Sequence, residues 1–200
     1  MSKFTKADPQ MKRWYKWREK ISDLSQQILK LQPEGEPSII AVSKFLLTSQ
    51  LVEFQLRELL LTLGFNEWLK SGKDYISDPA DFDEKQYTLG ALVNKELIKY
   101  INVVGVKLLL KRLKTLVRQR NQFTHGLFGS HLPIEKLQPL SVKGSTLGES
   151  LLVSMLQLER KMNDKQDKYL TRIKKLKNPT PKEEILRQIW IGKVEPEKLK

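Results

Sequence analysis

Apolar residues recur at intervals of three and four positions along most of this chain, and no other feature constrains its fold as strongly. These intervals match the 3.6 residues of a helical turn, so each run predicts a helix with one buried face. The first run follows Asp8 and Pro9, a predicted N-cap and first helical residue. It consists of Trp14, Trp17, Ile21, Leu24 and Ile28. The sequence shows neither a β-hairpin signal nor an internal repeat.

Further helices are predicted downstream, separated by connectors rich in Pro, Gly and acidic residues. Ser38 is the predicted start of a long helix that ends at Gly64, where a C-terminal glycine cap belongs. Later helices are predicted over about 89–101, from Val106 onward, from Thr146 to about Leu176, and from Thr180 to about Gly192. Thr146 and Thr180 each precede a glutamate by three residues, as in a capping box. Connectors are predicted at 71–87 and 129–145, and a joint between helices at 103–105.

These patterns predict an all-α protein. We expect an up-and-down helical bundle of four to five long helices over residues 1–176, followed by a basic appendage over 177–200 with a short helix. Two hundred residues are enough to bury a sizeable core. At 40% hydrophobic and 30% charged residues, the chain is too apolar for a disordered protein and too charged for a membrane protein.

The chain is strongly basic, with 36 Lys and Arg residues against 23 Asp and Glu residues and a formal charge of +13. Such an excess favours a polyanionic partner, most often a nucleic acid or an anionic membrane surface. Uncharged stretches are too short to span a bilayer, and basic residues occupy the region where a signal peptide would have its apolar core. Without cysteine, the chain has no disulfides, thiolate metal sites or thiol nucleophiles. We therefore expect a cytoplasmic protein that does not bind membranes.

The basic residues are concentrated in one interval. Between Glu96 and Glu135 there is no acidic residue. Within this interval Lys107, Lys111, Lys114 and Arg118 fall at i, i+4, i+7 and i+11 on one predicted helix. Their mutual repulsion costs a few tenths of a kcal/mol per pair, whereas a bound phosphate backbone would convert it into affinity. We interpret these four residues as an RNA-binding face, the alternative being a helix face that is merely solvated.

The same helix ends in the one motif with catalytic potential. Histidine alone has an unperturbed pKa suited to acid–base work near neutrality, which makes His125 and His131 the candidates. Arg120 precedes His125 by five residues, so on an ideal helix the two diverge by about 140° and lie about 7.5 Å apart along the axis. An arginine fork binds phosphate oxygens bidentately. Asn121 shares a face with His125 and could orient its imidazole.

Motifs for cofactors and metals are missing from the sequence. It contains no dinucleotide-binding or P-loop glycine pattern, no nucleophile elbow and no zinc-protease motif. Asp81, Asp83 and Glu84 lack the remaining ligands of a calcium loop, and two histidines six residues apart do not make a transition-metal site. We therefore predict neither a metal nor a cofactor.

The segment Arg120-Asn121-Gln122-Phe123-Thr124-His125 resembles the signature of the HEPN superfamily (higher eukaryotes and prokaryotes nucleotide-binding domains). That signature is an arginine, commonly followed by a polar residue, and a histidine after four to six intervening positions. The family is built from helical bundles, as predicted here. The resemblance implies metal-independent endoribonuclease activity, in which the RNA 2′-OH attacks the adjacent phosphorus and leaves a 2′,3′-cyclic phosphate and a 5′-OH. It further implies that His125 is the acid–base group and that Arg120 stabilises charge on the phosphorane.

The resemblance also carries implications for partners. Family members commonly form homodimers in which two motifs face one cleft, and small members act in phage defence or as toxins beside an antitoxin or defence partner. Some carry a tyrosine two residues after the histidine that a partner nucleotidyltransferase modifies; this chain has Leu127 there. Two other classes stay open, a non-catalytic basic module that binds RNA or DNA and a protein-interaction bundle. Arg120 could equally extend from the edge of the core, and Glu53 could pair with Arg57 without an active role.

Overall fold

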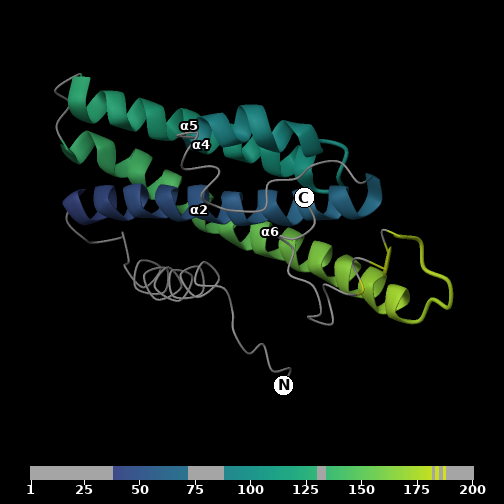
Figure 1. Ribbon diagram of the computed structural model, residues 1–200. Helices are drawn as coiled ribbons and strands as arrows, with labels where there is room; N and C mark the ends of the chain where they lie inside the picture. The colour runs from purple at the N-terminus through teal and green to yellow at the C-terminus, as the bar shows by residue number, and fades with distance from the viewer. Residues whose placement is uncertain (1–37, 72–87, 130–133, 182, 185–186, 188–200) are drawn as a thin grey trace, which may run out of the picture.

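The computed structural model describes residues 38–71, 88–129, 134–181, 183–184 and 187 (Figure 1). Its elements are α2 (Ser38–Ser71), α4 (Leu89–Ala91), the π-helical turn η1 (Leu92–Glu96), the 3₁₀ turn η2 (Leu97–Tyr100), α5 (Val106–Gly129) and α6 (Ile134–Lys174). The described residues contain helices and no strand, which confirms the all-α bundle. The helix predicted to begin at Pro9 lies outside the described residues.

In the described part of the chain, the long helices α2, α5 and α6 form the body of the bundle (Figure 1). α2 and α6 run parallel, because polar contacts join them in the same order along both helices. These contacts are Lys44 with Glu149, Gln55 with Glu159, and Thr62 with Gln166. α5 runs antiparallel to both, since its first residues lie against the middle of α6 and Phe123 lies against Phe45 near the start of α2. The short segment from α4 to η2 packs on α2 and α5.

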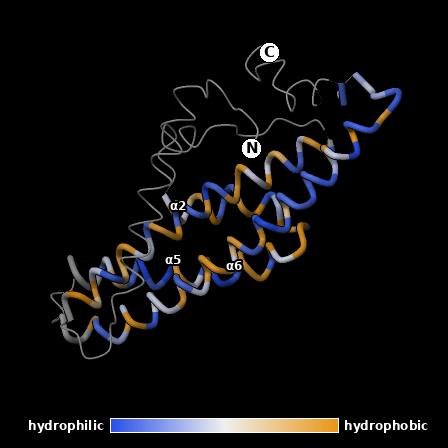
Figure 2. Tube along the Cα trace, turned by 90° about the horizontal axis from the view of Figure 1, so that it is seen from below, coloured by the Kyte–Doolittle hydropathy of each residue, from blue (hydrophilic) through white to orange (hydrophobic). Residues whose placement is uncertain are grey.

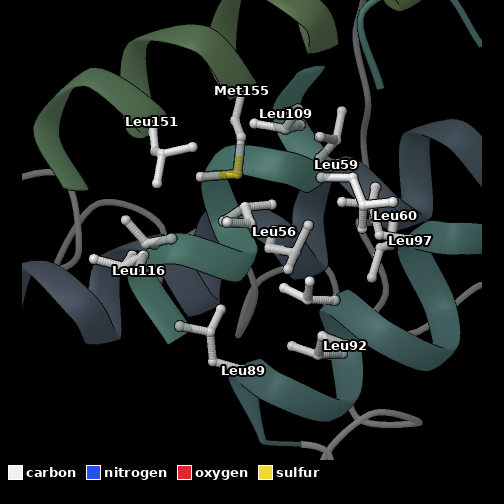
Figure 3. Packing of buried hydrophobic residues seen from close by; sticks show 14 of the residues in the cluster. Leu56, Leu59, Leu60, Leu89, Leu92, Leu97, Leu109, Leu116, Leu151 and Met155 are labelled. Atoms are coloured by element: carbon white, nitrogen blue, oxygen red, sulfur yellow. The ribbon is translucent and has the colours of Figure 1, made fainter. Parts of the chain in front are cut away.

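Leucine supplies most of the core between these helices (Figure 3). The buried side chains of α5 include Val106, Leu109, Leu110, Leu113 and Leu116, as the helical spacing predicts. Figure 2 shows that hydrophobic and hydrophilic residues alternate along each long helix, as expected when one side faces the core and the other faces solvent. Among the described helices none is long and apolar enough to cross a membrane.

α6 begins much earlier than predicted. Residues 134–145, expected to be a connector, form its first turns, and Thr146 lies inside the helix, where its hydroxyl donates to the carbonyl of Val142 at 3.0 Å. The expected capping box at Thr146 is therefore wrong. Pro139 lies inside this helix, in its second turn, where it has no N–H to donate to the carbonyl of residue 135.

Gly144 explains why this segment is helical despite its composition. A Cβ at Gly144 would overlap the ring of Phe45, and one at Gly148 would overlap the Thr48 side chain. The two glycines are four residues apart on one face of α6, so they let α2 approach closely. Their role is in helix packing, a tertiary effect that outweighs the poor helix propensity of glycine.

α2 also extends beyond its predicted end, because Gly64 lies within the helix and not at its cap. Burial drives this extension. Leu69 and Ile173 of α6 form a second small core, against which Phe65 and Trp68 pack with their rings stacked at 5.8 Å. The apolar contacts beyond Gly64 outweigh its tendency to end a helix.

The predicted joint before α5 is present and lies at Gly105. Its φ of 95° is a conformation that glycine adopts without strain, and α5 starts at the next residue. The predicted capping box at Thr180 is also confirmed. The Thr180 backbone N–H donates to Glu183 Oε2 at 2.8 Å, and the Glu183 N–H donates to Thr180 Oγ1 at 3.3 Å.

We expect Gly144→Ala to destabilise the protein by about 1–2 kcal/mol. Alanine gains about 1 kcal/mol in helix propensity but costs more through overpacking against Phe45. The shift in denaturation midpoint at unchanged m-value measures the effect. Gly90→Ala is the matched control, because its Cβ would make an ordinary 3.6 Å contact with Val117. Equal stability of the two variants would contradict a tight contact between α2 and α6.

The Thr180 capping box should be sensitive to acid. Its hydrogen bonds lower the pKa of Glu183 below 4.5, so the stability that they contribute is present above this pH and lost as pH falls through the lower, folded value. An NMR titration of the Glu183 carboxyl should show the depressed pKa. Thr180→Ala should raise that pKa part of the way, because the hydroxyl is lost and the backbone donor remains. An unchanged pKa in this variant would contradict the hydroxyl's contribution.

Candidate nucleic-acid interface

The four predicted RNA-binding residues lie on one exposed face of α5. Lys107, Lys111, Lys114 and Arg118 are all solvent-exposed, as their spacing predicts. None of the four forms an ion pair with a carboxylate of the described residues. By contrast, Lys44, Arg57, Lys99 and Arg120 each bind a carboxylate. Among the described residues, the exposed face of α5 thus differs from the cations that face the core or its edge.

His125 continues this exposed face. It lies eighteen residues after Lys107, which is five full helical turns, so the two side chains leave the helix in the same direction about 27 Å apart. Asn121 is exposed about 60° from Arg118 around the helix. No hydrogen bond joins the side chains of Asn121 and His125, both of which the structure describes. We call the six residues Lys107, Lys111, Lys114, Arg118, Asn121 and His125 the α5 basic face.

Phe123 determines which way the neighbouring side chains point. It is fully buried and meets Phe45 of α2 edge to face, with ring centroids 5.2 Å apart. Because Phe123 points into the core, His125, two residues later, points about 160° away from it and toward solvent. Arg120 is only about 60° from Phe123 and thus lies at the edge of the core.

Arg120 is directed toward α2, where it binds Glu53. Its guanidinium Nη1 lies 3.2 Å from Glu53 Oε2, and the two side chains are 31% and 19% exposed. A guanidinium has five N–H donors and this contact uses one of them, so the others can bind a further acceptor. Arg120 and His125 therefore leave α5 on different sides, as the predicted divergence of about 140° requires.

From the sequence, Glu53 was predicted only to pair with Arg57. The predicted pair with Arg57 is confirmed, since Arg57 Nη2 lies 3.0 Å from Glu53 Oε1. In addition, Glu53 Oε2 accepts hydrogen bonds from Arg120 and from the backbone N–H of Leu89, the first residue of α4, at 3.2 Å each. One carboxylate thus joins α2, α4 and α5. The available signal was a glutamate within the apolar stretch 51–56 of the sequence.

The described residues offer no evident metal centre, because no group of three or more His, Asp or Glu side chains among them is placed to hold an ion. His131, the second candidate histidine, lies outside the described residues. The described site brings together cations, the imidazole of His125 and the half-buried carboxylate of Glu53.

Comparison of the chain with family models, with curated proteins and with solved structures finds no match.

Proposed function

We propose that this protein binds RNA along the α5 basic face and cleaves it without a metal ion. The observation that carries the proposal is the position of His125, exposed and in line with four cations that no described carboxylate neutralises. An RNA strand bound along this face would pass next to the imidazole of His125.

Counterion release would supply the binding energy. Each phosphate that a lysine or arginine contacts releases condensed cations, and the affinity for a single strand then falls with salt by about 0.7 log units per contact and per log unit of salt. Lys107, Lys111, Lys114 and Arg118 together would give a slope of about −3. Binding also removes the repulsion among these like charges.

His125 would supply the chemistry. An exposed imidazole can take the proton of a ribose 2′-OH as that oxygen attacks the adjacent phosphorus, and a protonated one can donate to the departing 5′-oxygen. Such a group contributes about 10²- to 10⁴-fold to the rate. Arg120 would stabilise the phosphorane with N–H groups not used by Glu53.

Because Arg120 and His125 diverge, a homodimer with one shared cleft is part of this proposal. In such a dimer, the Arg120 of one copy and the His125 of the other would act on one phosphodiester. Action in phage defence or as a toxin, with an antitoxin or defence partner, belongs to the same proposal by analogy with the HEPN superfamily.

A second candidate function is a non-catalytic RNA- or DNA-binding module. It is favoured by the contact between Arg120 and Glu53, which gives this arginine a structural role independent of any substrate. Binding would then depend on the α5 basic face alone.

Cleavage of labelled RNA in excess EDTA tests the first proposal. We expect 2′,3′-cyclic phosphate and 5′-OH ends, with a rate that falls about 10²- to 10⁴-fold in His125→Ala while the RNA affinity stays nearly constant. Lys111→Ala with Lys114→Ala should weaken binding and lower the salt slope by about 1.4. Lys143→Ala, an exposed lysine on α6, is the control for loss of charge alone.

The possible outcomes separate the two functions. Salt-sensitive binding without cleavage supports the non-catalytic module. Cleavage that survives both Arg120→Ala and His125→Ala contradicts the assignment of these residues.

Glu53→Gln tests whether Arg120 needs its carboxylate partner. The variant keeps the size of the side chain but removes the charge, so we expect about 1–2 kcal/mol of lost stability. If Arg120 acts on the phosphorane, kcat should also fall while KM changes little, because a poorly held arginine loses contacts made in the transition state.

Arg57→Gln is the matched control, since Arg57 binds the same carboxylate as Arg120 but lies on α2, outside the proposed site. It should lower stability and leave kcat unchanged. A loss of kcat in both variants that follows their loss of stability would show that Glu53 has only a structural role.

A further inference from the structure

A groove between the start of α5 and the middle of α6 lies beside the α5 basic face and shares none of its six residues. Its volume is about 530 Å³, and its floor is made by Leu109, Leu158 and Met162. The groove follows α6 from Ser154 to Lys168, about 21 Å or four helical turns.

One wall of the groove is an exposed aliphatic ridge. Val104 is 86% exposed and Leu108 is 65% exposed. Ile98 and Ile101, which precede them at intervals of three, are also exposed, so apolar side chains continue from η2 through the joint into α5. Exposed apolar side chains gathered beside a groove are typical of an interaction site.

The opposite wall is basic. Lys161, Lys165 and Lys168 lie at i, i+4 and i+7 on α6, all exposed, and Asp164 is the carboxylate among the described lining residues. Arg112 adds a further charge at the end of the groove, where it binds the hydroxyls of Ser154 at 2.9 Å and Ser150 at 2.5 Å. The groove is therefore apolar along one side and positively charged along the other.

We propose that this groove binds an acidic amphipathic helix of a partner protein. Its apolar residues, spaced at i, i+3, i+4 and i+7, would cover Val104, Leu108 and the floor. Its glutamates and aspartates, on the adjoining flank, would face the three lysines. Met162 in the floor suits such docking, because its unbranched side chain adapts to different apolar partners.

The observations favour this occupant over other polyanions. The described residues that line the groove include no aromatic side chain, so bases of RNA would have nothing to stack on. A membrane surface is flat, whereas the ridge and the lysines face each other across a concavity. The binding does not depend on the proposed nuclease activity, and it uses the side of α5 next to Lys107 and Lys111.

Selection from a displayed library of amphipathic peptides of about 16 residues tests the proposal, with the full chain as bait. We expect the enriched peptides to be acidic. Their affinity should fall at least about tenfold on Leu108→Glu, the change expected when a central apolar contact is replaced by a charge. Val153→Glu is the matched control, since Val153 is 55% exposed on α6 but does not line the groove. Circular dichroism verifies that both variants fold.

Reversal of the lysine charges provides a second arm. Lys161→Glu with Lys165→Glu and Lys168→Glu should select basic peptides in place of acidic ones. The proposal is overturned if no peptide is enriched over Leu108→Glu, or if the enriched peptides are neutral or basic on the wild-type chain. It is also overturned if Leu108→Glu reduces only the binding of single-stranded RNA or of anionic phospholipid vesicles. None of these outcomes bears on RNA cleavage, which the EDTA assay measures separately.

Discussion

The ring of Phe45 holds the three long helices in register. It lies against Gly144 of α6, where a Cβ would overlap the ring, and meets Phe123 of α5 edge to face. Because Phe123 is fixed in the core, the directions of its neighbours on α5 are fixed as well. His125 must point to solvent, and Arg120 must lie at the edge of the core. The arrangement of the candidate site thus follows from a packing contact that involves none of its polar residues.

The half-buried Arg120 is paired with a carboxylate, that of Glu53. The same carboxylate accepts from Arg57 and from the first N–H of α4, so three elements converge on one charged group. Cations at the interior are paired in this way, and Lys44 follows the same rule with Glu149 at 3.2 Å. The basic residues on the outer face of α5 are not paired with a described carboxylate, although a helical bundle needs no excess of positive charge for its stability. That contrast supports the proposed binding of a polyanion to this face.

Spacing along one helix could be predicted from the sequence, whereas relations between helices could not. Three features of α5 follow from 3.6 residues per turn: its buried stripe, the exposed face formed by the four cations, and the different directions of the Arg120 and His125 side chains. Gly64 was predicted to end a helix, and Gly144 was placed in the predicted connector 129–145, because propensity alone cannot show that a neighbouring helix needs a small residue. Glu53 and Arg57, four apart, were paired correctly. The contact of Glu53 with Arg120 spans 67 residues, so it required the packing of α5 on α2.

The side chains of α5 fall into three groups around the helix axis. Leu109, Leu113 and Leu116 face the core, and the cations and His125 face solvent. Leu108 and Arg112 lie on the flank toward α6, and Val104, just before the helix, lines the same groove. Gly105 has a positive φ between Val104, which is 86% exposed, and the first turn of α5. An occupant of the groove would lie within one helical turn of Lys107, so its acidic residues would compete for the charge that attracts RNA. A protein partner in the groove would therefore weaken RNA binding without touching His125, some 27 Å away along the helix.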